Sequence, residues 1–213
     1  MTIGVLKQTK KCGLSPRFGN ILPAELLAKS YIGSAKPPFR AMIARFTRKS
    51  NRAGGIEGGI SNGEPGDVLG RPPRNFLFLS DSTLTNNRAV GGAGSVGGLG
   101  RGGAIDNGEN ATATISGTLI GDNQTFGGSG TVTGGDGLGG GLYNEIRSDV
   151  TLCGCTVTGN QATGGNGPTA GRGIGGGVYN TPGGTVWVDA LTLIFANDAS
   201  TSEDDVFGIL TFL

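Results

Sequence analysis

Short runs of alternating apolar and polar residues recur along the C-terminal part of the chain. In the segment DVTLCGCTVTGN, one face of an extended chain would carry Val150, Leu152, Cys155 and Val157. A bend at Gly154 is needed to keep all four on that face, and a period of two residues is typical of β-strands with one buried face. Two other segments repeat the pattern, with the equivalent residues Leu77, Leu79, Ser82 and Leu84, and Ala113, Ile115, Thr118 and Ile120. The pattern predicts pairs of short strands separated by a bend.

These strand pairs belong to a longer internal repeat. One series of segments aligns on asparagines spaced 36, 37 and 37 residues apart, namely Asn87, Asn123, Asn160 and Asn197. A second series, GGISN, GGAIDN, GGGLYN and GGGVYN, aligns at spacings of 45, 37 and 36 on Asn62, Asn107, Asn144 and Asn180. The longer first spacing is assigned to a surface loop with the sequence GEPGDVLGRPPR. A repeat of this length predicts a solenoid in which each unit adds one coil.

Both asparagine series are expected to lie on the turns of the coil, because asparagine tolerates the left-handed backbone conformation. Equivalent amides would then lie above one another and hydrogen-bond along the stack, as amide ladders do in cross-β assemblies. The predicted site residues are therefore structural ones: Asn62, Asn107, Asn144, Asn180, Asn87, Asn123, Asn160 and Asn197. The sequence assigns no catalytic, cofactor-binding or metal-binding residue.

The segments GGGLYN…VTLCGCTVTGNQA and GGGVYN…ALTLIFANDA resemble the repeats of right-handed parallel β-helix proteins, the pectate-lyase-like superfamily. The closest resemblance is to glycine-rich surface proteins and polymorphic outer-membrane proteins. It implies an all-β, single-stranded parallel β-helix of about four coils over residues 54–213. It also implies a non-catalytic module of the cell-envelope or adhesin type, located on the cell surface or secreted, with a carbohydrate or cell-envelope component as its partner.

One departure from that family is an additional glycine-rich segment in each unit. The three segments are GGAGSVGGLGRGG, GGSGTVTGGDGLGG and GGNGPTAGRGIGG. Because they recur at one place in the unit, they should project from one side of the stack as neighbouring loops. Their composition buries little apolar surface, so we expect them to be the least ordered part of the β-helix. They match neither a phosphate-binding loop nor a calcium-binding nonapeptide.

Charge divides the chain near residue 51. Residues 1–50 contain ten Lys and Arg against one acid, whereas residues 51–213 contain seven Arg against fifteen acids. We therefore predict a basic N-terminal extension over residues 1–53, partly helical or disordered, with helices expected at LPAELLAKSYIG and PPFRAMIARFTRKS. A basic amphipathic helix can contact an anionic membrane or nucleic acid, and for residues 1–50 both contacts stay open. No nucleic-acid binding is expected of the β-helix, and the N-terminus lacks the apolar core of a signal peptide.

A solenoid also needs capped ends, because a terminal coil exposes unpaired strand edges. The last nine residues, DVFGILTFL, are expected to cover the C-terminal end with Phe207, Ile209, Leu210 and Phe212. The basic extension is the candidate cover for the other end.

The absence of histidine narrows the chemistry available to this chain. It removes Ser-His-Asp, Cys-His and His-zinc sites. The motif Cys153-Gly154-Cys155 suggests a redox pair, but a thioredoxin-type site uses Cys-x-x-Cys at the start of a helix. Cys155 aligns with Ser82 and Thr118, so we interpret both cysteines of the motif as small structural residues. Three cysteines do not indicate a disulfide framework.

An alternative function is that of a carbohydrate-active β-helix protein, a polysaccharide lyase or epimerase, or an inactive remnant of one. Lyases of the resembled superfamily combine a calcium-binding group of acids with an arginine base. The candidates here are Asp106, Asp122, Asp136 and Asp149, with Arg101, Arg147 or Arg172. These acids fall in different columns of the repeat, which favours a protein without catalytic activity and leaves calcium as the one cofactor still open. Convergence of acids from adjacent coils with an arginine would favour the enzyme.

Overall fold

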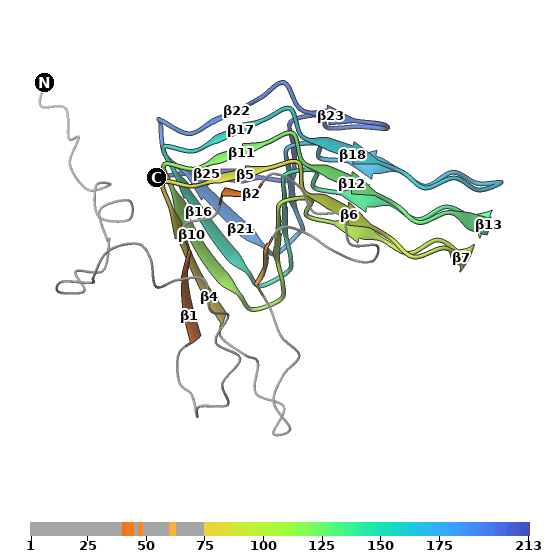
Figure 1. The fold of residues 1–213 in the computed structure, drawn as a ribbon, viewed down its shortest axis with the longest axis horizontal. Helices are drawn as coiled ribbons and strands as arrows, with labels where there is room; N and C mark the ends of the chain where they lie inside the picture. Colours follow the sequence, from red (N-terminus) through yellow and green to blue (C-terminus); the bar gives the residue numbers. More distant parts are fainter. Residues whose placement is uncertain (1–39, 45–46, 49–59, 63–74) are drawn as a thin grey trace, which may run out of the picture.

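The chain folds as an all-β parallel solenoid. A computed structural model describes residues 40–44, 47–48, 60–62 and 75–213 of the 213-residue chain. Within these ranges every strand pair is parallel, and equivalent strands of successive coils lie beside one another (Figure 1). The predicted fold class, a parallel β-helix, is confirmed.

Three sheets, which we call the body, enclose the core. Sheet A contains β1 (Arg40–Ala44), β4 (Asn75–Ser80), β10 (Thr112–Ser116), β16 (Asp149–Cys153), β21 (Thr185–Val188) and β25 (Leu210–Phe212). Sheet B contains β2 (Thr47–Arg48), β5 (Thr83–Thr85), β11 (Leu119–Gly121), β17 (Thr156–Thr158) and β22 (Leu193–Phe195). Sheet C contains β3 (Ile60–Asn62), β9 (Ile105–Asn107), β15 (Leu142–Asn144), β20 (Val178–Asn180) and β24 (Val206–Phe207).

Between sheets B and C the chain makes a long excursion that we call the fin. It leaves the body along sheet D, with β6 (Arg88–Val90), β12 (Gln124–Phe126), β18 (Gln161–Thr163) and β23 (Asp198–Ala199). The tip forms sheet E, with β7 (Gly94–Val96) and β13 (Gly130–Thr133). The chain returns along sheet F, with β8 (Gly100–Arg101), β14 (Gly137–Leu138) and β19 (Gly173–Ile174). Three coils carry the full excursion, which extends to one side of the body (Figure 1).

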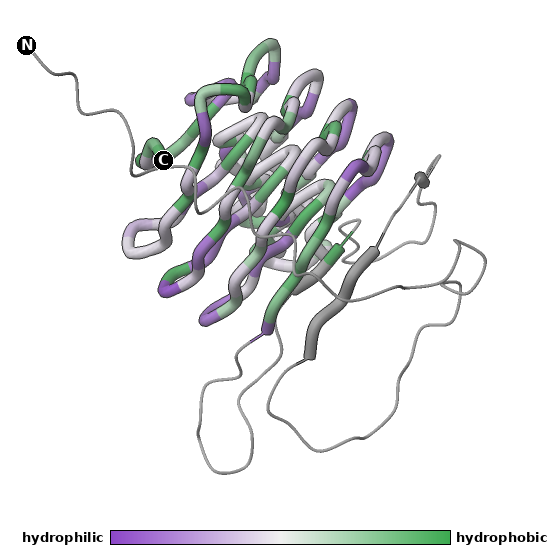
Figure 2. The backbone as a smooth tube through the Cα atoms, turned by 90° about the vertical axis from the view of Figure 1, so that its left-hand side faces the viewer, coloured by the Kyte–Doolittle hydropathy of each residue, from purple (hydrophilic) through white to green (hydrophobic). Residues whose placement is uncertain are grey.

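The core of the body is built from columns of equivalent residues. All twelve positions predicted to face inward are buried, with relative exposures from 0 to 6%. In sheet B, for example, Leu84, Ile120 and Val157 occupy one column, since they are paired directly in the sheet. The tube in Figure 2 shows how these apolar stretches recur at the same place in each coil. The alternation in the sequence therefore predicted the buried face correctly.

The fin is ordered, contrary to the expectation from its composition. Its outgoing and returning arms bond to each other through their backbones: Gly98 N donates to Gly92 O at 2.8 Å, and Gly135 N donates to Gly128 O at 2.8 Å. Bonds of the same length connect successive coils, from Gly128 N to Gly98 O and from Gly165 N to Gly135 O. Backbone pairing in two directions replaces the apolar core that these segments lack.

Glycine is required in the fin because the arms approach at backbone distance. A Cβ atom added to Gly135 would lie 2.0 Å from the Gly98 carbonyl oxygen, and one added to Gly127 would lie 1.8 Å from the Gly135 oxygen. Real Cβ atoms do not come this close to other atoms. The glycine-rich composition thus reflects close packing of main chains.

The turns correct a second expectation. None of the ladder asparagines within residues 75–213 has a positive φ angle. The left-handed residue is the one before each member of the first series: Asn86, Asp122, Gly159 and Ala196, with φ between 54° and 66°. In the second series it follows the asparagine by three residues, at Asn110, Arg147 and Gly183. The asparagines are therefore placed beside the sharp turns but do not make them.

The two ends of the solenoid also differ from the prediction. Strands β1 and β2 pair with β4 and β5, so the described parallel pairing already includes Arg40, inside the segment assigned to the basic extension. Residues 40–44 form a strand, and the helix expected there is wrong. The helix expected over residues 22–33 and the loop expected over GEPGDVLGRPPR lie outside the described residues. At the other end, Ile209 and Phe212 are 79 and 71% exposed, so they do not form the expected cover.

Candidate functional site

The first asparagine series forms a continuous hydrogen-bonded ladder. Each amide nitrogen Nδ2 donates to the Oδ1 of the asparagine in the next coil, at 2.9 Å for Asn87, 2.8 Å for Asn123 and 2.9 Å for Asn160. The same Oδ1 atoms also accept the backbone N–H of the preceding asparagine at 3.0 Å. At the last step, Asp205 takes the place of an asparagine, accepting from Asn197 Nδ2 at 2.9 Å and from its backbone N at 3.0 Å.

The second series forms a parallel ladder on sheet C. Asn107 Nδ2 donates to Asn144 Oδ1 at 2.8 Å, and Asn144 Nδ2 donates to Asn180 Oδ1 at 2.9 Å. Asn180 ends the ladder by donating to the Ile209 carbonyl at 2.9 Å. Asn62 pairs in register with Asn107 through its strand, while its side chain lies outside what the structure describes. The predicted ladders are confirmed from Asn87 to Asn197 and from Asn107 to Asn180, and both hold buried polar groups in place.

The acids named by the sequence mostly lie apart. Asp122 and Asp149 are exposed on the sheet D and sheet A sides of the coil. Asp136 pairs with Arg172 of the next coil at 3.0 Å, and Arg147 pairs with Glu109. Asp106 is the exception, because Arg101 and Glu145 act on it electrostatically and Arg101 pairs with Glu145 at 3.3 Å. Asp106 and Glu145 come from adjacent coils, so two acids and one arginine do converge.

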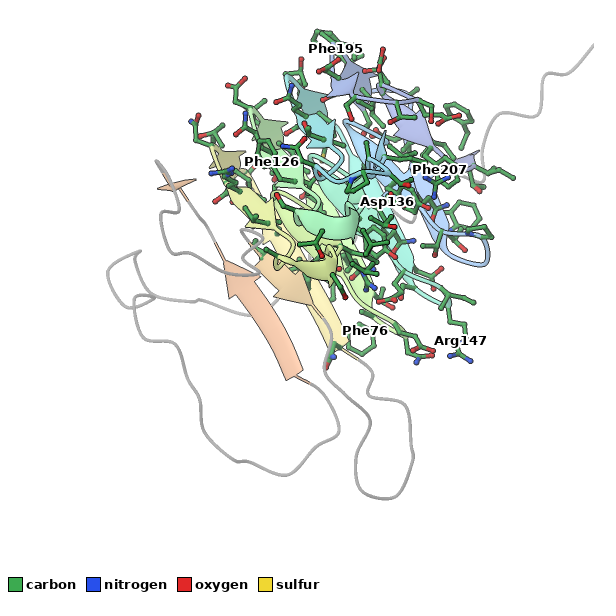
Figure 3. The ribbon with its side chains drawn as sticks, turned by 90° about the vertical axis from the view of Figure 1, so that its right-hand side faces the viewer. Phe76, Phe126, Asp136, Arg147, Phe195 and Phe207 are labelled. Carbon is green, nitrogen blue, oxygen red and sulfur yellow. The ribbon has the colours of Figure 1, made fainter. Side chains whose placement is uncertain are left out.

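This group lies in the angle between sheets F and C, which we call the corner surface. Sheet F contributes Arg101, Leu138 and Ile174, and sheet C contributes Asp106, Tyr143, Tyr179 and Phe207. Leu138, Ile174 and Tyr143 are buried, whereas Arg101, Asp106, Tyr179 and Phe207 are partly exposed. The ring centroids of Tyr143 and Tyr179 are 5.3 Å apart, and those of Tyr179 and Phe207 are 4.4 Å apart. In the view of Figure 3, Phe207 and Asp136 appear on the same side, and Phe126, from the outgoing arm of the fin, appears apart from them.

The base of the fin positions these side chains. Gly102, Gly139 and Gly175 have φ angles of 51°, 66° and 64°, and each turns the chain from sheet F into sheet C. The turn brings the outer face of sheet F against the outer face of sheet C, where Leu138, Tyr143 and Ile174 pack together. Because the turn recurs in every coil, the aromatic residues stack in a column along the solenoid.

The pKa values of Asp106 and Tyr143, at the N-terminal end of this column, are shifted. Burial raises the pKa of Asp106 to about 6, against an opposing effect of the Arg101 guanidinium. One carboxylate oxygen of Asp106, Oδ1, is buried and has no hydrogen-bond partner within the described residues. Burial also raises the pKa of Tyr143 from 10.0 to about 12. Arg101 lies over the Tyr143 ring, 5.2 Å from its centroid, and so joins the charged group to the aromatic column.

Sequence reasoning missed the aromatic column and Glu145. The signal was present, because Asp106, Tyr143 and Tyr179 occupy the same position of the GGxΦxN segment, between the buried residue and the asparagine. Glu145 immediately follows one of those asparagines. The alternation of apolar and polar residues could not show that sheet F folds back against the outer face of sheet C.

The Cys-Gly-Cys motif is not a redox pair within the body. Cys155 is buried and free, so the two cysteines are not joined to each other. Burial raises the pKa of the Cys155 thiol, which makes it a poor nucleophile. In the neighbouring coils its position is occupied by hydroxyl residues, and Thr118 Oγ1 donates to the Ser116 carbonyl at 2.8 Å. The interpretation of Cys155 as a small structural residue fits this column.

Comparisons of the chain with protein-family models, curated protein sequences and solved structures found no match. Among the described residues, no group of three or more acids and cysteines could hold a metal ion. Calcium binding therefore stays a prediction from the resemblance. No helix in the described part of the chain has the length and hydropathy of a membrane span.

Proposed function

We propose that this chain is a non-catalytic β-helix module that is displayed on the cell surface or secreted and binds a carbohydrate or another cell-envelope component through the corner surface. The observation that carries the proposal is the aromatic column beside a charged group, in which the partly exposed Tyr179 and Phe207 stack with the buried Tyr143. Binding sites for small polar ligands combine aromatic side chains with a few placed polar groups. A column that repeats along the solenoid suits a ligand that is itself a repeating polymer.

The charged groups of this surface are mostly committed to partners. Arg101 pairs with Glu145, and Arg172 pairs with Asp136 both through its guanidinium and through its backbone N, at 2.7 Å. An arginine held in an ion pair stays protonated and does not act as a base. This supports ligand binding over proton abstraction.

A carbohydrate-active enzyme is the second candidate, and Asp106 is the observation that favours it. A carboxyl group with a pKa of about 6 can both donate and accept a proton near neutral pH. Glu145 from the next coil supplies a second carboxylate close to it. In this alternative Asp106 and Glu145 act on a uronic-acid polymer, and Arg101 contacts its carboxylates.

One experiment separates the two candidates. The purified chain is incubated with polygalacturonate, alginate and neutral polysaccharides, and both retention in affinity electrophoresis and release of unsaturated or reducing ends are measured. Retention without product, reduced by Tyr179→Ala, supports the binding module. Product formation that Asp106→Asn abolishes supports the enzyme. Absence of both retention and product rejects the corner surface as a carbohydrate site.

Two controls make this readout specific. Val132→Ala changes an exposed side chain at the tip of the fin and should leave retention unchanged. Repeating the assay with calcium and with a chelator tests the predicted cofactor, since only a calcium-dependent site responds. Surface display is tested separately, by protease treatment of intact producing cells and detection of the chain in the medium.

A further inference from the structure

Two asparagines within residues 75–213 are directly followed by glycine, and the structure places them in opposite surroundings. They are Asn107, before Gly108, and Asn166, before Gly167. In such a pair the glycine backbone N can approach the side-chain amide carbon of the asparagine, because glycine has no side chain to hinder it. Whether this approach is possible depends on how the fold holds the amide and the main chain.

Asn107 is held on all sides. It ends strand β9, which pairs with β3 and β15, and its side chain is 0% exposed. Its Nδ2 donates to Asn144 Oδ1 at 2.8 Å and to the Asp149 carbonyl at 3.3 Å. Reaction at this amide would first have to break the ladder, which leaves buried polar groups unpaired.

Asn166 is free of these restraints. It is exposed near the tip of the fin, it belongs to no strand, and the chain bends at residues 167 and 168. Within the described residues, neither its side-chain amide nor the backbone N of Gly167 takes part in a hydrogen bond. The packing of the fin also requires the glycine, since a Cβ added to Gly167 would lie 2.6 Å from the Gly134 backbone N. The fin therefore places a glycine N–H without a partner beside an exposed asparagine amide.

We propose that Asn166 is a site of spontaneous deamidation, which converts the tip of the fin into an aspartate or isoaspartate form. The backbone N of Gly167 bonds to Cγ of Asn166, the Cγ–Nδ2 bond breaks, and Nδ2 leaves as ammonia with the proton that the Gly167 N gives up. Water then opens the succinimide ring. Opening at Cγ gives aspartate, and opening at the main-chain carbonyl gives isoaspartate.

The isoaspartate form changes the main chain of a region that main-chain contacts hold together. The Asn166 carbonyl now accepts from Gly130 N at 2.8 Å, and in isoaspartate this carbonyl becomes a side-chain carboxylate. The main chain also gains a methylene between two bonds to the middle coil, from Gly165 N to Gly135 O at 2.8 Å and from Thr169 N to Val132 O at 3.2 Å. The third coil of the fin should therefore separate from the second. This inference concerns the fin and does not depend on a ligand at the corner surface.

Peptide mass spectrometry of the full-length chain tests the proposal. The purified chain is kept at mildly alkaline pH, sampled over several weeks and digested with trypsin, which separates Asn107 in fragment 102–147 from Asn166 in fragment 148–172. Replacement of –NH2 by –OH is located by fragmentation, and an isoaspartyl methyltransferase labels the isoaspartate. In the folded chain Asn166 should convert about tenfold or more faster than Asn107, because the ladder bonds add to the barrier at Asn107.

Two controls separate the fold from the dipeptide. In guanidinium chloride both asparagines should convert at similar rates, since both precede glycine and neither is held. Asn166→Gln should abolish conversion in fragment 148–172 of the folded chain, because glutamine would have to close a larger ring, and should leave Asn107 unchanged.

Faster conversion at Asn166 that disappears in denaturant supports the site. Absence of conversion at Asn166 in the folded chain rejects it, and so do equal rates at the two asparagines before denaturation. Amide hydrogen exchange of the aged chain tests the structural consequence. Residues 127–137 and 164–174 should exchange faster than in the fresh chain, and unchanged exchange in a converted sample rejects the separation of the coils.

Discussion

The body and the fin contain the same repeat, yet they are stabilised in different ways. In the body, side chains decide the structure: apolar columns fill the interior and asparagine ladders pair its buried polar groups. In the fin, main chains meet directly, and the arms bond to one another within and between coils. The body therefore depends on which side chain is present, and the fin depends on side chains being absent.

The largest expected effect comes from breaking a ladder in the body. Asn160→Leu removes the acceptor of both the backbone N and the Nδ2 of Asn123, and the donor to the Ile120 carbonyl. Leaving two or three buried polar groups unpaired should lower the free energy of unfolding by about 4 kcal/mol. Urea denaturation measures the change.

Asn166→Leu is the control for this substitution, because Asn166 is exposed near the tip of the fin. It should change the free energy of unfolding by less than about 0.5 kcal/mol. If both variants lower the free energy of unfolding by similar amounts, the hydrogen bonds of the ladder do not account for the loss at Asn160.

The next largest effect is expected in the fin. Gly135→Ala places a Cβ atom 2.0 Å from the Gly98 oxygen, so the two arms must move apart. This should lower the local stability of the fin by about 2 kcal/mol. Amide hydrogen exchange should accelerate in the fin and stay slow in the body. Gly92→Ala is the matched control, because no atom lies within 4 Å of its added Cβ, and exchange should not change. Acceleration throughout the body would show that the two regions unfold as one unit.

The same contrast explains what the sequence could predict. Alternation and the spacing of asparagines predicted the body, because a buried face needs particular side chains at particular intervals. The glycine-rich segments carry no such pattern. Their order comes from backbone bonds to the other arm of the same coil, 6 or 7 positions away, and to neighbouring coils, 27 to 37 positions away. The same absence of pattern hid the corner surface. Asp106 was named as a candidate, but its neighbours Tyr143 and Glu145 became visible only after sheet F was placed.

A third prediction concerns the junction of the two regions, at Asp106. Its folded-state pKa of about 6 lies above the ordinary value of 3.8, so the folded chain binds more protons between these values than the unfolded chain. The contribution of this group to stability is therefore lost as pH rises from about 4 to about 6. Asp106→Asn should stabilise the protein by about 2 kcal/mol more at pH 7 than at pH 4. Thermal melts across this range measure it, and a difference that is constant with pH contradicts the assignment.

The smallest effect is expected where the body already accepts several residue types. The column of Cys155 contains Ser82 and Thr118, and each of these hydroxyls donates to the carbonyl two residues earlier, at 2.7 and 2.8 Å. Cys155→Thr can donate in the same way to the Cys153 carbonyl, which the thiol now contacts at 3.6 Å. The free energy of unfolding should therefore change by less than about 1 kcal/mol.

Val157→Thr tests why the column of Cys155 accepts hydroxyl residues, because it introduces the same threonine two residues later in the sequence. Val157 is 0% exposed in a column with Leu84 and Ile120, so its hydroxyl would enter the apolar core. Burying a hydroxyl there should cost about 1 to 3 kcal/mol, measured by the same urea denaturation. If threonine at position 155 costs as much as at position 157, the carbonyl two residues earlier is not what makes the column of Cys155 tolerant of hydroxyl groups. Unequal costs would show that, in the body, neighbouring columns differ in the chemistry they accept even though both are fully buried.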